Sequence, residues 1–166
     1  MMLIVAGVAG SGKTTVGKLI AGKLSWEFAD GDDFHSQANM AKMRSGRPLS
    51  DADRFPWLAA IGIWMDEQAA AGKSAVVACS GLARRYRDAL LAGRDEARIA
   101  FLEVTREEAF RRLHRRHGHF FGEQMVNSQF AELEEPQPDE RHTYPVPSDR
   151  PPEQLAGHII VMLRLA

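Results

Sequence analysis

The amino-acid sequence predicts an α/β fold in which helices flank a parallel β-sheet. Three observations lead to this prediction. Short runs that are apolar on both faces, as buried parallel strands are, recur at residues 2–6, 74–79 and 99–104. Stretches with helical spacing separate these runs, so strands and helices alternate along the chain. The first run also leads directly into a phosphate-binding motif and a helix.

Length and composition indicate one globular domain over residues 1–166. Charged residues make up 26% of the chain and hydrophobic residues 45%, so neither a disordered nor a fibrous class is indicated. The net charge of -1 gives no reason to expect nucleic acid or an acidic membrane surface as a partner. A single cysteine, Cys79, excludes an intramolecular disulfide and favours a reducing compartment. The N-terminal apolar run is too short for a signal peptide or a membrane span, so we expect a cytoplasmic protein without a membrane partner.

The segment Gly7–Thr14 matches the phosphate-binding motif G-x-x-x-x-G-K-[ST] and precedes a helical pattern at 15–24. Its glycines let the backbone turn several N–H groups inward, and the following helix N-terminus adds positive potential. We expect Lys13 to reach the terminal phosphates of a nucleoside triphosphate and the Thr14 hydroxyl to help hold Mg²⁺. A chance match in a glycine-rich turn is the alternative, and the surrounding strand and helix argue against it. The expected nucleotide contacts are Gly7, Val8, Ala9, Gly10, Ser11, Gly12, Lys13, Thr14 and Thr15.

An acidic turn follows a shorter strand candidate at 26–30. Ligands of parallel sheets bind beyond the carboxyl ends of the strands, and Asp30, Asp32 and Asp33 crowd this strand end. Next to bound phosphates these carboxylates could serve Mg²⁺ through water and accept a proton from a substrate hydroxyl. The alternative is a turn that caps the next helix, because Asp is a favoured N-cap residue. One carboxylate could cap the helix while another serves Mg²⁺ or accepts the proton.

Two helices are predicted next. The first covers residues 36–49 and ends at Gly46 and Pro48, and the second has a capped start at 50–53 and an apolar stripe. Arg54 in the first turn of the second helix could pair with an anionic substrate, although a surface ion pair is an equally ordinary role.

Small residues end the strand predicted at 74–79, and a cluster of arginines follows it. Arg84, Arg85 and Arg87 could recognise carboxylate or phosphate, or they could form the solvated face of a helix. Cys79 is most simply a small buried apolar residue, because the sequence shows no paired histidine to activate it.

A basic segment follows the strand predicted at 99–104. Arg112 and Arg116 lie four residues apart and share one helix face, where both could reach a polyphosphate. The segment could also bind nucleic acid or be solvated surface, and its histidines lack a Cys or carboxylate to complete a zinc site. An amphipathic helix predicted at 122–134 is bounded by a glycine and prolines, as expected of a movable lid over about 117–137.

The end of the chain is rich in proline. Residues 136–152 contain six prolines and are predicted to form an irregular connection. A short last strand is predicted near 144–146, although its prolines disfavour a strand. A helix over 153–163 closes the chain.

Several motifs together resemble one family, the gluconate kinases of the P-loop kinase group, which are related to shikimate and adenylate kinases. The resemblance runs from Gly7 to about Pro136, and its later motifs are far more specific than the widely shared phosphate loop. The motifs are Gly7-Val8-Ala9-Gly10-Ser11-Gly12-Lys13-Thr14, Asp30-Gly31-Asp32-Asp33-Phe34-His35 with Asn39, Lys42-Met43, Gly46-Arg47-Pro48-Leu49, Asp53-Arg54 with Pro56-Trp57-Leu58, Cys79-Ser80 with Tyr86-Arg87-Asp88, Gly118-His119-Phe120-Phe121, and Gln129-Phe130 with Leu133-Glu134-Glu135-Pro136.

This resemblance implies a three-layer fold with a five-stranded parallel sheet and a helical lid, a homodimer, and transfer of the γ-phosphate of ATP to the 6-hydroxyl of D-gluconate. It implies that Asp30 positions Mg²⁺ through water and that Asp32 acts as the base or positions the hydroxyl. Catalytic roles would then fall to Lys13, Asp32, Arg112 and Arg116, the two arginines serving the lid and the γ-phosphate. The residues expected at the acceptor are Asp30, Asp32, His35, Arg54, Ser80, Arg87 and His119.

The chain departs from the family pattern at three places. Ser36 stands where Pro is usual, residues 81–85 replace the usual Ala-Leu-Lys-Lys, and residues 144–150 replace a Val-Asp-rich last strand. A kinase for another small hydroxy acid, such as shikimate or a different sugar acid, is therefore the second interpretation. The third is a non-enzymatic nucleotide-sensing or RNA-binding module that uses the basic run 111–116. The near-neutral charge and the lack of stacking aromatics among those arginines argue against it.

Overall fold

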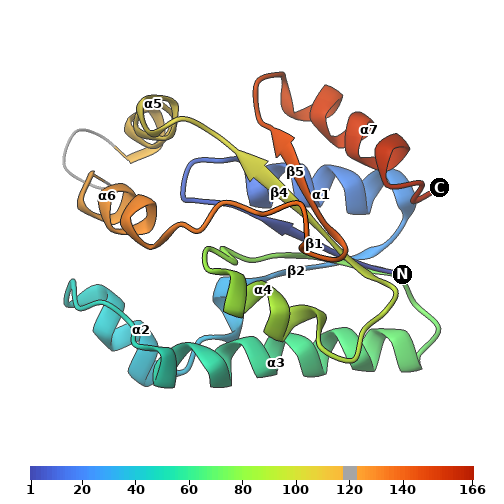
Figure 1. Ribbon diagram of the computed structural model, residues 1–166, viewed down its shortest axis with the longest axis horizontal. Helices are drawn as coiled ribbons and strands as arrows, with labels where there is room; N and C mark the ends of the chain where they lie inside the picture. Colours follow the sequence, from blue (N-terminus) through green and yellow to red (C-terminus); the bar gives the residue numbers. More distant parts are fainter. Residues whose placement is uncertain (118–122) are drawn as a thin grey trace.

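A single parallel β-sheet organises the chain (Figure 1). The computed structural model describes residues 1–117 and 123–166, with the side chains of residues 116 and 117 outside the described part. Within these residues, five strands pair in the order β2-β3-β1-β4-β5, and every pairing is parallel. The strands are Met2–Ala6 (β1), Glu27–Asp30 (β2), Ala75–Ala78 (β3), Ala97–Glu103 (β4) and Thr143–Pro147 (β5). The five-stranded parallel sheet is thus confirmed.

Helices cover both faces of this sheet and one end of the molecule. α1 and α7 lie on one face, α3 and α4 lie on the other, and α5 and α6 stand beyond the carboxyl ends of the strands (Figure 1). The helices are Lys13–Leu24 (α1), Gln37–Arg44 (α2), Asp51–Ala70 (α3), Arg84–Leu91 (α4), Arg106–His117 (α5), Glu123–Glu132 (α6) and Pro152–Met162 (α7), with a 3₁₀ turn, η1, at Gly31–Phe34.

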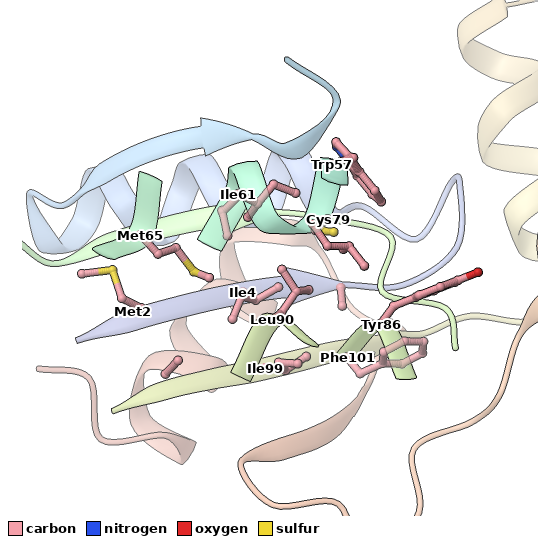
Figure 2. Packing of buried hydrophobic residues seen from close by; sticks show 14 of the residues in the cluster. Met2, Ile4, Trp57, Ile61, Met65, Cys79, Tyr86, Leu90, Ile99 and Phe101 are labelled. Atoms are coloured by element: carbon pink, nitrogen blue, oxygen red, sulfur yellow. The ribbon is translucent and has the colours of Figure 1, made fainter. Parts of the chain in front are cut away.

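The central strand β1 is buried on both faces, as its continuous apolar sequence predicts. Successive side chains of a strand point to opposite faces, so Ile4 packs towards α3 and α4 while Leu3 and Val5 pack towards α1 and α7. Figure 2 shows the first of these two cores, where Ile61 of α3 and Leu90 of α4 close over Ile4. Two buried layers hold the carboxyl ends of the strands in fixed positions.

Side chains cap the N-termini of α2 and α3. Ser50 and Asp53 form the predicted capped start of α3 as a reciprocal capping box. Ser36 caps α2 by accepting a hydrogen bond from the Asn39 N–H at 3.1 Å, so this departure from the family pattern serves as a helix cap. The predicted helix 36–49 is too long, because α2 ends at Arg44 and Gly46 turns the chain with φ of 71°.

β5 forms despite its prolines, which confirms the short last strand near 144–146. It lies at the edge of the sheet and pairs only with β4, so a missing proline N–H can face away from the ladder. The Ile99 and Ser148 N–H groups close the two ends of this pairing with hydrogen bonds of 2.8 Å to His142 and Glu103. Among the helices of the described residues, none is both long and apolar enough to cross a bilayer.

Candidate active site

The phosphate loop joins β1 to α1 and depends on three glycines in the left-handed region. Gly7, Gly10 and Gly12 have φ of 139°, 80° and 99°. A Cβ on Gly7 would lie 2.7 Å from the Leu102 carbonyl oxygen, and a Cβ on Gly10 would lie equally close to that of Ala109. Because a real Cβ does not approach backbone so closely, both the backbone angles and the space require glycine at these two positions.

Lys13 and Thr14 begin α1 at the mouth of this loop. The Lys13 ammonium donates to the Val8 carbonyl oxygen at 3.0 Å and so lies across the loop. The Thr14 hydroxyl donates to the Asp30 carboxylate at 3.0 Å. The structure thus brings together the two residues expected at the metal, one from each of two strand ends. Mg²⁺ prefers oxygen ligands and retains several waters, so a hydroxyl and a carboxylate beside a phosphate loop fit it.

One of its own carboxylates, that of Asp30, stabilises the acidic turn after β2. Asp30 caps η1 by accepting a hydrogen bond from the Asp32 N–H at 3.1 Å, while its other oxygen accepts from Thr14. The Asp32 side chain reaches solvent, yet the surrounding protein still removes enough water to raise the pKa of its carboxyl. The neighbouring Asp30 charge raises that pKa further, whereas Lys13 and His35 act in the opposite direction. Asp32 therefore holds a proton more readily than an ordinary aspartate.

Trp57 of α3 holds the acidic turn after β2 in place. Its indole N–H donates to the Gly31 carbonyl oxygen at 2.7 Å, and its ring stacks on His35 with centroids 4.3 Å apart. Burial lowers the pKa of His35 and the Arg54 charge lowers it further, although Asp32 opposes both. His35 thus lies within the electrostatic reach of Asp32 and Arg54, three residues that the sequence expected at the acceptor.

Arg54 reaches the same edge from the first turn of α3. Its guanidinium donates to the Tyr86 hydroxyl at 2.9 Å and forms an ion pair of 2.8 Å with Glu132 of α6. The Tyr86 hydroxyl in turn donates to the Asp51 carboxylate at 2.5 Å. The Arg54 side chain remains 18% exposed, so an anionic ligand can approach it.

Arg87, expected at the acceptor, is enclosed within the protein. Its side chain is 0% exposed, and its guanidinium forms a two-pronged ion pair with Glu140 at 2.7 and 2.8 Å. It also donates to the carbonyl oxygens of Gly81 and Leu82. Burial opposes ionisation of Glu140, but the hydrogen bonds from Arg87 and the Gln137 N–H outweigh it and lower the pKa of this carboxyl. The pair fastens the loop after β3 to the loop before β5.

Arg112 joins the phosphate loop to the β5–α7 connection. Its guanidinium donates to the carbonyl oxygen of Ser148 at 2.7 Å and to that of Ser11 at 3.3 Å, while Glu108 accepts from its Nε at 2.8 Å. A cavity of about 300 Å³ opens beside these contacts between Arg112, Arg150 and the first turn of α1. The side chain of Arg116, predicted to share its helix face, lies outside the described part of the chain.

The remaining predicted residues have differing positions. Ser80 lies two residues after β3, and its carbonyl oxygen accepts from the Gly7 N–H at 3.1 Å. His119 lies outside the described residues.

Cys79 is buried, as predicted, and burial raises the pKa of its thiol to about 12, which makes it an inert packing residue. In the residues that the structure covers, no group of three or more His, Cys, Asp or Glu side chains is arranged to hold a metal ion.

Helix α6 closes one side of the site, and the sequence patterns assign no role to its polar contacts. Gln129 accepts a hydrogen bond from the Ala9 N–H of the phosphate loop at 2.6 Å, and Glu132 holds Arg54. Val126, Phe130 and Leu133 pack in one cluster with Val8. The motif that contains Gln129 contributed to the family resemblance, and this is the only signal in the sequence that could have singled it out.

The chain is similar to known kinases in sequence and in fold. A family model described as shikimate kinase matches residues 9–164. A gluconokinase from Gluconobacter oxydans (strain 621H) is 45% identical over 138 residues, which are 83% of this chain and 78% of that protein. The structure of a gluconokinase from Sinorhizobium meliloti 1021 matches with a TM-score of 0.87 and 37% identity, over 99% of this chain and 93% of that one. The structure of a sugar kinase from Janibacter sp. HTCC2649 matches with a TM-score of 0.90 and 41% identity, over 99% and 95%.

Proposed function

Because the chain belongs to the gluconokinases, within the P-loop kinases related to shikimate kinase, we propose that it transfers the γ-phosphate of ATP to the 6-hydroxyl of D-gluconate. The observation that carries this proposal is the hydrogen bond of 3.0 Å between Thr14 and Asp30. It joins the end of the phosphate loop to the acidic turn, so a phosphate donor and a hydroxyl acceptor can meet at one edge of the sheet.

On the donor side, the phosphates of ATP would lie against the backbone N–H groups of the loop and the N-terminus of α1. Lys13 would keep its hydrogen bond to the Val8 carbonyl and donate its other N–H groups to the terminal phosphates, where it would stabilise the charge that develops. The cavity beside Arg112 and Arg150 is next to the first turn of α1, a position that suits the nucleoside. Thr14 and Asp30 would hold Mg²⁺, directly or through water. When bound, this ion would neutralise charge on the transferring phosphate.

On the acceptor side, Asp32 would receive the proton of the attacking hydroxyl. The hydroxyl oxygen forms the new bond to the γ-phosphorus, the bond from that phosphorus to the bridging oxygen breaks, and ADP leaves with the electron pair. The raised pKa of Asp32 favours this role, because a base with a pKa closer to the working pH accepts a proton more readily. Arg54 would bind the carboxylate of gluconate, in place of or beside Glu132.

We also propose that Arg116 and His119 complete the site, His119 from a lid over about 117–137 that contains α6. The chain would act as a single domain over 1–166 and as a cytoplasmic homodimer. Analytical ultracentrifugation tests the oligomeric state, and a monomer at micromolar concentration would contradict the dimer.

A panel of acceptors tests the activity. Gluconate, shikimate and several other sugar acids are offered with ATP and Mg²⁺, and ADP release is measured with a coupled assay. We expect the highest kcat/KM with gluconate, and phosphorus NMR of the product is expected to place the phosphate on the 6-oxygen. A rate with another hydroxy acid and none with gluconate would contradict the proposed acceptor and favour the second interpretation of the sequence.

A further inference from the structure

One peptide of the phosphate loop is held from both sides. The Val8 carbonyl oxygen accepts a hydrogen bond of 3.0 Å from Lys13, and the N–H of the same peptide unit, on Ala9, donates to the Gln129 side chain at 2.6 Å. A peptide unit is planar, so its carbonyl and N–H turn together. The contact made by Gln129 therefore determines where the partner of Lys13 lies.

Helix α6 also contacts the acceptor side of the site. Glu132 lies three residues after Gln129, so both side chains project from one helix face. Glu132 forms its ion pair with Arg54, the cation proposed to bind the acceptor, at 2.8 Å. Val126 and Phe130 pack in the same cluster as Val8, which seats the helix on the loop. Helix α6 thus contacts both the Val8–Ala9 peptide and Arg54.

We propose that Gln129 is a positioning residue for phosphoryl transfer. It orients the Val8–Ala9 peptide and, through that peptide, Lys13. It also couples the donor and acceptor sites, because a shift of α6 moves the contacts that this helix makes with both. This role rests on the proposed function, because it assumes that Lys13 serves the phosphates and Arg54 the acceptor. Nucleotide and gluconate then act on the same helix, so the binding of one changes the affinity for the other.

The substitution Gln129→Leu tests this role, because Leu has a similar size and no acceptor for the Ala9 N–H. We expect kcat to fall roughly tenfold, the effect of leaving the partly buried Ala9 N–H without its acceptor. Gluconate affinity is also measured by calorimetry with and without a nonhydrolysable ATP analogue. We expect the ratio of the two affinities to approach one in Gln129→Leu and to keep its wild-type value in the control Gln124→Leu, which alters an exposed residue of the same helix.

Gln129→Glu supplies a second arm, because a carboxylate can still accept from the Ala9 N–H. We expect it to recover most of the affinity ratio, although its charge weakens nucleotide binding. Wild-type kcat and affinity ratio in Gln129→Leu would overturn the proposal, as would equal loss of the ratio in the Leu and Glu variants. A melting temperature of Gln129→Leu well below that of Gln124→Leu would also overturn it in favour of a structural role. Failure of the wild-type protein to phosphorylate gluconate would instead contradict the proposed function.

Discussion

The proposed donor and acceptor sides of the site are built in different ways. The donor side is one continuous segment, Gly7–Thr14, whose shape follows from glycines at required backbone angles. The acceptor side is assembled from side chains on separate elements, with Asp32 on η1, Arg54 on α3, Tyr86 on α4 and Glu132 on α6. Phosphate binding is thus a local property of the chain, whereas acceptor recognition depends on how the elements pack.

Arg54 and Arg87 make this difference concrete. Both were predicted to lie near the sugar acid. Arg54 lies in the first turn of α3, and Arg87 lies near the start of α4, the helix that follows β3. Arg54 is partly exposed and pairs its guanidinium with Glu132 of α6, whereas Arg87 is enclosed with Glu140. We therefore propose that Arg54 serves recognition and Arg87 serves packing. Four substitutions test the two sides of the site, and the last two test this distinction between the arginines.

The largest effect is expected on the donor side, from Lys13→Ala. Removing one preorganised cation from a phosphoryl-transfer site lowers kcat by roughly 1,000-fold. The melting temperature is expected to stay at the wild-type value, because Lys13 begins a helix and is not part of the core. Steady-state kinetics measure the loss, with the exposed Lys23→Ala on the same helix as control. Near-normal turnover of Lys13→Ala would contradict the donor assignment.

The next effect is expected from Asp32→Asn, which removes the proposed base. We expect kcat to fall roughly 100-fold or more. Because the folded-state pKa of Asp32 is raised, its contribution to stability is present at low pH and is lost as pH rises through that pKa. The Asn variant should therefore melt slightly above the wild type at pH 7 and equally at pH below the unfolded pKa. The neighbouring Asp33→Asn is the control, and equal kinetic losses in both variants would remove the special role of Asp32.

A stability effect without a kinetic one is expected from Glu140→Gln. It leaves the Arg87 charge buried without a full partner, which lowers the free energy of unfolding by about 3 kcal/mol. The lowered pKa of Glu140 means that this stabilisation is lost as pH falls through its folded-state pKa, so the variant and wild type should converge in acid. Urea unfolding measures the difference, with the exposed Glu67→Gln as control. A changed KM for gluconate in Glu140→Gln would return Arg87 to the acceptor site.

The smallest effect is expected from Arg54→Lys, which keeps the charge but loses the planar fork that matches a carboxylate. We expect KM for gluconate to rise roughly tenfold while KM for ATP stays unchanged. Arg44→Lys, at an exposed position of α2, is the control. A rise in KM for ATP alone would show that Arg54 serves the donor side and would end the contrast drawn above.

Much of the fold could be predicted because each signal was local. The apolar run at β1, the glycines of the loop and the capping pair at Ser50 and Asp53 all determine their own conformation within a few residues. The parallel α/β fold and the positions of Lys13, Thr14 and Asp30 followed from the same signals, whereas the kinase fold followed from the family resemblance. The helix expected over 36–49 was too long, because Gly46, left-handed directly after the Ser45 C-cap, ends α2 at Arg44.

What the sequence by itself determined is the parallel sheet, the phosphate loop and the acidic turn that faces it. The tertiary structure alone decided that Arg87 is enclosed while Arg54 stays partly exposed, because the carboxylates that pair with these two guanidinium groups are distant in the chain. Glu140 lies 53 residues after Arg87 and Glu132 lies 78 residues after Arg54, and no local pattern relates them. The contact between Gln129 and Ala9 spans 120 residues. This contact forms only because α6 packs against the phosphate loop, and the sequence of the loop does not predict that packing.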